Sequence, residues 1–191
     1  MTIPDGSSRL PITTSVATSG EMRELGRRLA VVLRAGDLVI LSGPLGAGKT
    51  TLTQGIADGL GVRGPITSPT FVIARVHPPL RADPGLGGRT PPLVHADAYR
   101  LGSALELDDL DLDADLETSV TVVEWGEGRA EDLSEDRLEI VITPAPPSVV
   151  PDTEGAPDSD DNDAPRAVSI SGVGSRWQDI QLPPADVGNR L

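Results

Sequence analysis

The fold of this 191-residue chain is decided by the stretch Leu38-Val39-Ile40-Leu41-Ser42-Gly43-Pro44-Leu45-Gly46-Ala47-Gly48-Lys49-Thr50. Its first four residues are apolar, which is typical of a strand buried on both faces of a parallel sheet. The glycine-rich segment after them predicts a tight turn, and residues 49–60 predict a helix that is closed by Gly61. The stretch therefore predicts a strand–turn–helix unit of an α/β domain.

Residues 43–50 also match the pattern GxxxxGK[ST], in which each residue type serves the binding of a phosphate chain. Glycines let backbone N–H groups approach the phosphates, and the start of the helix adds partial positive charge. Lys49 is the only Lys beside 15 Arg, and its slim ammonium fits between phosphates where a guanidinium is too broad. Thr50 offers a hydroxyl to Mg²⁺. We therefore predict that a nucleoside triphosphate is bound by Gly43, Leu45, Gly46, Ala47, Gly48, Lys49, Thr50 and Thr51.

Alternating helix and strand patterns surround this unit. A capping box at Thr18 and Glu21 predicts a helix that ends near Ala35-Gly36. Apolar or alternating runs predict strands at 71–76, 93–95, 120–123, 138–142 and 166–171. We expect segments 138–143 and 166–171 to be neighbouring antiparallel strands. The expected fold class is α/β: a P-loop NTPase-like, mainly parallel sheet flanked by helices, with an antiparallel C-terminal hairpin.

The acidic residues help to set the expected limits of the domain. The net charge of −13 equals the charge of two tracts without basic residues, 101–119 with seven acids and 144–165 with six. Segment 144–165 is also rich in Pro, Ser and Asp, which predicts a disordered insertion within the hairpin. We expect one domain over 12–172, with flexible tails at 1–11 and 173–191. A Pro- and Gly-rich loop at 77–92 reads as a second insertion.

Composition excludes several classes of protein. The absence of cysteine rules out disulfide scaffolds, thiol nucleophiles and cysteine-ligated metal sites. No apolar run approaches the roughly 18 residues of a membrane span, and the N-terminus lacks the apolar core of a secretory signal. The acidic charge opposes direct binding to a phosphate backbone. These observations favour a cytoplasmic protein that contacts other proteins rather than membranes or nucleic acid.

Two carboxylates follow predicted strands at the edge where doubly wound sheets bind ligands. Asp97 lies just past Val94 and His95, where it can reach a γ-phosphate, a metal shell or an attacking water. Glu124 ends the apolar run 120–123, and a carboxylate there needs a partner or a metal. The sequence leaves open which of the two is the main magnesium ligand. His95 is expected to be a hydrogen-bonded structural residue rather than a base.

Four clusters in this order resemble the TsaE (YjeE) family, small bacterial ATPases of tRNA threonylcarbamoyladenosine biosynthesis. They are Leu45-Gly46-Ala47-Gly48-Lys49-Thr50-Thr51, Ser68-Pro69-Thr70-Phe71, His95-Ala96-Asp97-Ala98-Tyr99-Arg100-Leu101 and Val122-Val123-Glu124-Trp125-Gly126-Glu127. The resemblance covers about residues 15–143 and the strand near Arg166. The chain departs from it at Ala96 and Ala98, where the family carries bulkier apolar residues, and in its two longer insertions.

The resemblance implies slow, Mg²⁺-dependent ATP hydrolysis that resets a complex of proteins resembling TsaD and TsaB, with tRNA touched only indirectly. It implies catalytic roles for Lys49, Asp97 and Glu124, Mg²⁺ ligation by Thr50 and Glu124, and nucleotide contact by Asp97. Thr70 resembles a switch element whose hydroxyl lies near the γ-phosphate; the alternative is that it is an ordinary residue at the entry to a strand.

Two other functions fit the same loop. A small-molecule kinase needs a cationic lid, for which residues 81–89 are the best candidate. A non-catalytic, nucleotide-gated scaffold is the other alternative.

The sequence does not decide where the Tyr99 and Trp125 side chains lie. They can lie beside the site, on a surface that binds a partner, or in the core.

Overall fold

The computed structural model describes residues 8–69, 73–80, 90–100, 116–144 and 165–183. Its helices and strands in chain order are β1 (Ser8–Arg9), β2 (Ile12–Val16), α1 (Ser19–Val32), β3 (Leu38–Ser42), α2 (Lys49–Leu60), β4 (Ala74–His77), β5 (Leu93–Asp97), η1 (Ala98–Arg100), β6 (Val120–Glu124), η2 (Glu131–Leu133), β7 (Arg137–Pro144), β8 (Arg166–Val173), η3 (Ser175–Trp177) and β9 (Gln181–Leu182).

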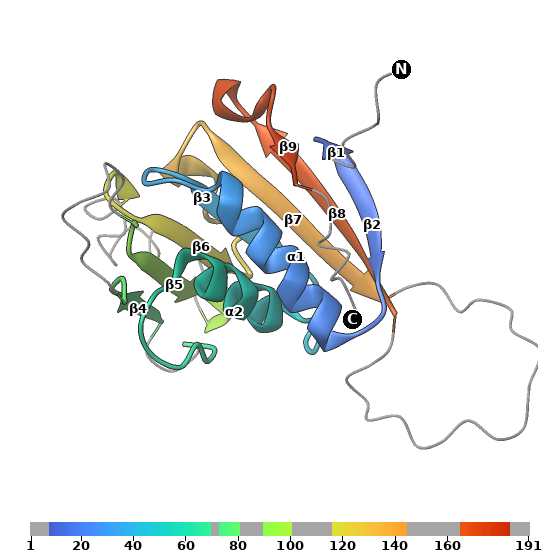
Figure 1. Ribbon diagram of the computed structural model, residues 1–191, viewed down its shortest axis with the longest axis horizontal. Coiled ribbons are helices and arrows are strands. Elements are labelled where there is room, and N and C mark those ends of the chain that lie inside the picture. Colours follow the sequence, from blue (N-terminus) through green and yellow to red (C-terminus); the bar gives the residue numbers. More distant parts are fainter. Residues whose placement is uncertain (1–7, 70–72, 81–89, 101–115, 145–164, 184–191) are drawn as a thin grey trace, which may run out of the picture.

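A seven-stranded sheet of order β2-β8-β7-β3-β6-β5-β4 forms the centre of the domain (Figure 1). Strand β3 pairs in parallel with β6 and β7, and β5 pairs in parallel with β6. Strands β2, β8 and β4 complete the sheet through antiparallel pairs. The predicted mainly parallel α/β sheet is therefore confirmed. So is the C-terminal antiparallel hairpin, which β7 and β8 form.

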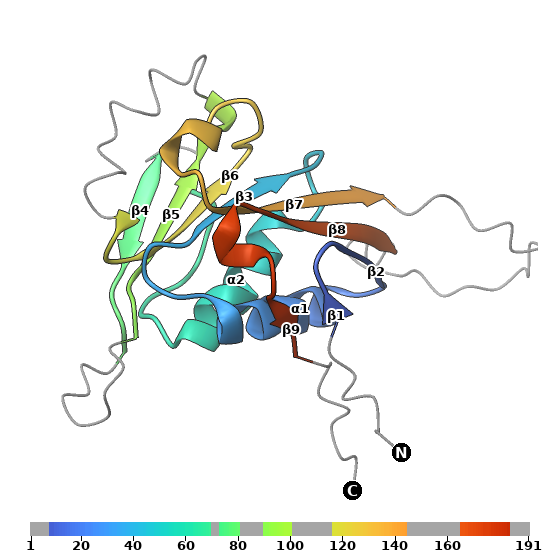
Figure 2. The ribbon, with the colours of Figure 1, turned by 90° about the horizontal axis from the view of Figure 1, so that it is seen from above.

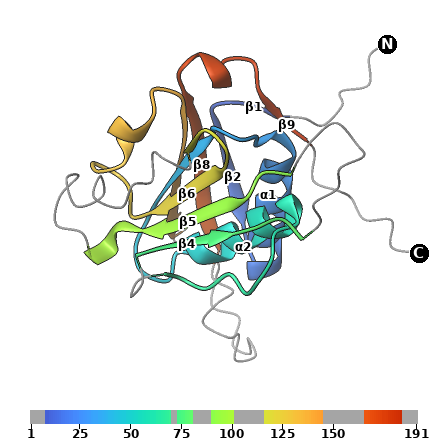
Figure 3. The same ribbon diagram turned by 90° about the vertical axis from the view of Figure 1, so that its left-hand side faces the viewer.

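Helices α1 and α2 lie side by side on one face of the sheet (Figures 1 and 3). Their apolar sides form the main core with the sheet, where Leu29, Leu52 and Ile56 are fully buried. Neither of these two described helices has the length and apolarity that a membrane span requires. The other face of the sheet carries a smaller cluster, in which Ala96 and Ala98 are fully buried.

The ends of both helices follow local sequence signals. The Thr18 hydroxyl accepts the N–H of Glu21, as the capping box predicts, whereas the Glu21 carboxylate accepts the N–H of Ala17, one residue before the cap. Helix α1 ends at Val32, earlier than expected, because Asp37 accepts the N–H of Arg34 and draws the chain into a turn. Helix α2 has the expected bounds and is closed by Gly61 in the left-handed conformation.

Both chain ends are more involved in the fold than the expected tails at 1–11 and 173–191. Strand β1 pairs with β9 (Figure 2). Trp177, which lies between β8 and β9 in the chain, is buried. The Arg176 guanidinium donates to both carboxylate oxygens of Asp37, at 3.0 and 2.9 Å, and to the carbonyl of Val32 at 2.7 Å. These contacts anchor the C-terminal segment at the start of β3, so the packed unit extends beyond 12–172.

Several expectations lie outside the described residues. They are the disordered insertion apart from its first and last residues, the lid candidate at 81–89, most of the acidic tract 101–119, and Thr70. Strand β4 begins at Ala74, and the first part of the strand predicted at 71–76 is likewise not described.

Candidate functional site

The loop between β3 and α2 requires its glycines. Gly43, Gly46 and Gly48 have φ values of 143°, 77° and 107°, a region that other residues rarely occupy. A Cβ on Gly43 would also lie 2.3 Å from the carbonyl oxygen of Ile142 in β7. Helix α2 starts directly after Gly48, so its first N–H groups, which have no partner within the helix, end at this loop.

Lys49 is held inside this loop. Its Nζ donates to the carbonyl oxygens of Gly43 at 2.8 Å and Pro44 at 3.0 Å. The same ammonium lies 3.6 Å from the centre of the Trp125 ring, a cation–π contact. Burial lowers the pKa of Lys49, while the nearby charges of Glu124 and Asp97 oppose that shift. The partly desolvated ammonium is therefore a strong point of attraction for an incoming anion.

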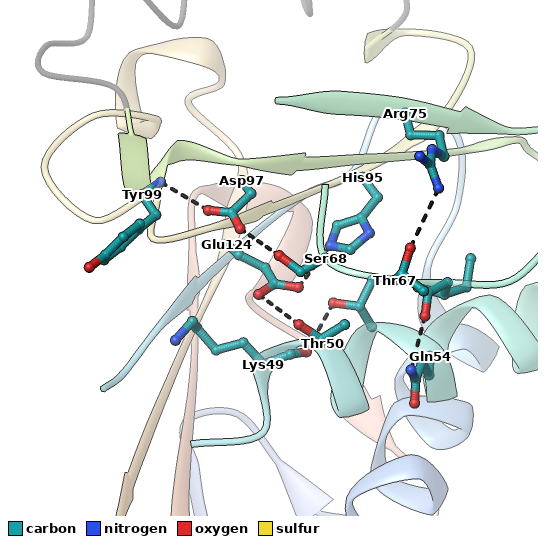
Figure 4. Close-up of polar contacts among 12 residues, drawn as sticks. Lys49, Thr50, Gln54, Thr67, Ser68, Arg75, His95, Asp97, Tyr99 and Glu124 are labelled. Atoms are coloured by element: carbon teal, nitrogen blue, oxygen red, sulfur yellow. Dashed lines mark hydrogen bonds and ion pairs between the residues drawn. The ribbon is translucent and has the colours of Figure 1, made fainter. Parts of the chain in front are cut away.

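The two carboxylates stand side by side at the ends of β5 and β6. Asp97 and Glu124 are register partners on these parallel strands, and each residue is only 2% exposed. Asp97 accepts the Ser68 hydroxyl at 2.7 Å and the Tyr99 N–H at 2.9 Å. Parallel pairing thus brings together two acids that lie far apart in the sequence (Figure 4).

Glu124 links Thr50 to His95 (Figure 4). Its Oε2 accepts the Thr50 hydroxyl at 3.0 Å, and its Oε1 lies 2.8 Å from His95 Nε2. His95 is therefore hydrogen-bonded, and its partner is a candidate metal ligand rather than the backbone.

Thr50 and Glu124 are the residues of this site that could hold a magnesium ion. Among the residues that the structure describes, no group of three or more His, Cys, Asp or Glu side chains could hold a metal ion. Thr50 and Glu124 present hydroxyl and carboxylate oxygens at one point. Mg²⁺ prefers such oxygens and takes its remaining ligands from water and substrate phosphates.

A pocket of about 320 Å³ joins these groups. The predicted residues that line it are Leu45, Gly46, Ala47, Gly48, Lys49, Thr50, Thr51, Asp97 and Glu124. Gly43 does not line the pocket; it contributes the carbonyl that Lys49 contacts. The predicted nucleotide contact Thr70 lies outside the described residues.

Six further residues line the pocket without having been predicted as ligands: Ser19, Met22, Ser68, Tyr99, Trp125 and Arg166. Ser68 belongs to the cluster at residues 68–71 that resembles the TsaE family, so this motif could have predicted its place at the pocket. Arg166 is 7% exposed and enters the site because β8 pairs with β2 and β7. Arg166 directly follows the acidic tract 144–165, and nothing in the local sequence predicts that it lies at the pocket.

The aromatic residues left open by the sequence lie at the pocket. The rings of Tyr99 and Trp125 are 5.0 Å apart between centroids and tilted by 53°. Trp125 has a φ of 60°, and non-glycine residues held in this region concentrate at functional sites. Tyr99 and Leu45 are 56% and 86% exposed, so the pocket has an apolar rim.

Comparison with known proteins decides the family. The model of the family "Threonylcarbamoyl adenosine biosynthesis protein TsaE" matches residues 16–148. The chain belongs to the TsaE family. The resemblance carried by the four sequence clusters is therefore confirmed.

TsaE proteins of several bacteria align with most of the chain. The TsaE protein of Streptomyces coelicolor is 60% identical over 157 residues, which is 82% of this chain and 93% of that protein. The TsaE protein of Mycobacterium tuberculosis is 55% identical over 141 residues, which is 71% of this chain and 77% of that protein. The crystal structure of YdiB from Bacillus subtilis superposes with a TM-score of 0.61 at 28% identity and covers 90% of each chain. The TsaE chain therefore shares its fold with a solved relative.

Proposed function

We propose that this chain binds ATP with Mg²⁺ and hydrolyses it slowly, in the cytoplasm, as part of tRNA threonylcarbamoyladenosine biosynthesis. One observation carries the proposal: the start of α2 and the ends of β5 and β6 bring Lys49, Thr50, Asp97 and Glu124 around one pocket. Cation, hydroxyl and two carboxylates are the groups that phosphoryl transfer from a nucleotide requires, since such catalysis consists mostly of positioning and charge neutralisation.

The loop and Lys49 hold the phosphates in this proposal. The N–H groups at the start of α2 donate hydrogen bonds to phosphate oxygens, and the helix dipole favours negative charge there. Lys49 exchanges the carbonyls of Gly43 and Pro44 for phosphate oxygens, which compensate its charge better than neutral carbonyls do. Arg166 brings a second cation to the pocket wall.

Thr50 and Glu124 hold the metal. Their oxygens are 3.0 Å apart and lie next to Lys49 in the same pocket. When bound, Mg²⁺ neutralises the negative charge on the phosphate oxygens during transfer. The Thr50–Glu124 bond favours Glu124 over Asp97 as the carboxylate that completes this pair.

Asp97 acts on the water that attacks the γ-phosphate. Its two oxygens are held by the Ser68 hydroxyl and the Tyr99 N–H, which fix the plane of the carboxylate. Because this carboxylate lines the pocket, it can orient a water for attack on the phosphate.

Hydrolysis would serve protein partners resembling TsaD and TsaB. The relatives of this chain are named as tRNA threonylcarbamoyladenosine biosynthesis proteins, and the net charge of −13 favours contact with proteins over tRNA. The exposed apolar rim at Leu45 and Tyr99 lies beside the nucleotide pocket. A partner seated there would sense the state of the nucleotide. No described contact favours the kinase, and two positioned carboxylates speak against an inert scaffold.

The test in vitro separates binding from hydrolysis with Asp97→Asn. We expect phosphate release to fall at least about tenfold, since a positioned base contributes on this scale or more. The affinity for ADP with Mg²⁺ should change less than threefold. The fluorescence of Trp125 reports binding in a Trp177→Phe background, because the chain has only these two Trp. Equal hydrolysis by the variant and the parent would contradict the role of Asp97, and stoichiometric phosphate transfer to a small acceptor would favour the kinase.

The pathway is tested in the source cell. Depletion of the protein is expected to reduce threonylcarbamoyladenosine in bulk tRNA, as measured by nucleoside mass spectrometry. Expression of the wild type should restore it and Asp97→Asn should not. Unchanged modification after depletion would remove the pathway while leaving the ATPase proposal intact.

A further inference from the structure

We propose that His95 is a positioning residue that fixes the orientation of Glu124 for Mg²⁺. The inference rests on the proposed function, because it assigns Glu124 to the metal. It goes beyond that function because it names a buried side chain that does not line the pocket. This side chain would decide which oxygen of the Glu124 carboxylate faces the metal.

The sheet sets this contact. His95 lies in the middle of β5 and is fully buried, and its register partner on β6 is Val122. Glu124 is two residues further along β6, so both side chains project from the same face of adjacent parallel strands. Their contact between Nε2 and Oε1 is 2.8 Å long and wholly inside the protein (Figure 4).

The tautomer of His95 follows from its partners. In this proposal Nε2 carries the ring proton and donates the hydrogen bond, because an ionised carboxylate only accepts hydrogen bonds. His95 Nδ1 is buried without a hydrogen-bond partner among the described residues. The bond to Glu124 is therefore the polar contact that holds the ring within the described part of the chain.

The two oxygens of Glu124 have separate partners. Oε1 is hydrogen-bonded to His95 and Oε2 to Thr50. Thr50 is the residue that holds the metal together with Glu124 in the proposed site. Removal of the His95 donor leaves Oε1 buried without this partner and lets the carboxylate rotate toward the ammonium of Lys49. Groups that orient a metal ligand in this way typically contribute 10- to 100-fold to metal affinity.

The chain offers a matched control in its other histidine. His77 is also buried, at 3% exposure, and its Nε2 also has no partner among the described residues. Its Nδ1 bonds the backbone carbonyl of Arg63, away from the pocket. Loss of His77 therefore tests the general effect of removing a buried imidazole.

The experiment compares His95→Leu, His95→Gln and His77→Leu by Mn²⁺ binding in the presence of ADP, measured by electron paramagnetic resonance. We expect His95→Leu to raise the Mn²⁺ dissociation constant at least about tenfold. His95→Gln, whose amide N–H can replace Nε2, should stay within about threefold, as should His77→Leu. Affinity for ADP in EDTA should change less than threefold in all variants. These results together support the proposal.

Three results would overturn it: an unchanged dissociation constant in His95→Leu, an equal rise in His77→Leu, or no rescue by His95→Gln. Nitrogen NMR of the wild type without nucleotide gives a separate readout, in which the His95 ring should carry its proton on Nε2; a proton on Nδ1 alone contradicts the proposal. Absence of any Mn²⁺–ADP binding by the wild type overturns the proposed function together with this inference.

Discussion

Replacement of Lys49 with Ala is expected to weaken the binding of ATP with Mg²⁺ at least about 100-fold, equivalent to about 2.7 kcal/mol. Lys49 is the only lysine in the chain, and its ammonium lies in the pocket beside two carboxylates. Without it, a triphosphate would meet Asp97 and Glu124 with much less compensation of charge. Calorimetric titration with ATP measures the loss, and hydrolysis should fall to background.

Lys49→Arg is the matched control, because it keeps the charge and changes the shape. The Nζ is enclosed by the carbonyls of Gly43 and Pro44 and by the ring of Trp125. A guanidinium is too broad for this space, so we expect Arg to recover only part of the affinity. Melting temperatures of both variants report whether the fold is kept. Affinity within threefold of wild type in folded Lys49→Ala would contradict the phosphate-binding role of the loop.

The predictable part of the site comes from local patterns. The run Leu38–Leu41, the loop glycines and Gly61 predict β3, the loop and α2 because each signal acts within a few residues of its effect. The nearness of Asp97 and Glu124 needs one more step, the rule that parallel strands end at one edge of a sheet. Their register pairing agrees with that rule.

The parts that sequence did not predict depend on contacts between distant segments. Arg166 reaches the pocket through the pairing of β8 with β2, and Arg176 reaches Asp37 across 139 positions. Neither residue belongs to a motif, and pairing between distant strands is not encoded by a short pattern. The β1–β9 pair and the Arg176 contacts therefore extend the packed unit beyond the range 12–172 that local patterns predict.

The packing of α1 on α2 also depends on residues that carry no motif. Gly55 in α2 faces the backbone of α1, and a Cβ placed there would lie 2.1 Å from the carbonyl oxygen of Arg23. The facing Gly26 is also in a tight place, since its Cβ would lie 2.5 Å from the carbonyl oxygen of Leu52. The two helix backbones are therefore in direct contact. An added methyl group would clash with backbone atoms, which cannot move aside as a flexible side chain can. Since Lys49 starts α2, this packing also fixes the helix that presents the loop.

Gly55→Ala is expected to lower the free energy of unfolding by about 4 kcal/mol, above the usual range for overpacking because the clash is with backbone. Helix propensity alone would predict a gain of up to about 1 kcal/mol, so the sign of the change separates the two effects. Gly20→Ala is the control: this exposed residue of α1 has only the Thr18 hydroxyl, at 3.7 Å, near the added methyl. Urea denaturation should show Gly20→Ala unchanged or slightly stabilised. A stable Gly55→Ala protein would mean that the helices pack less closely than this geometry requires.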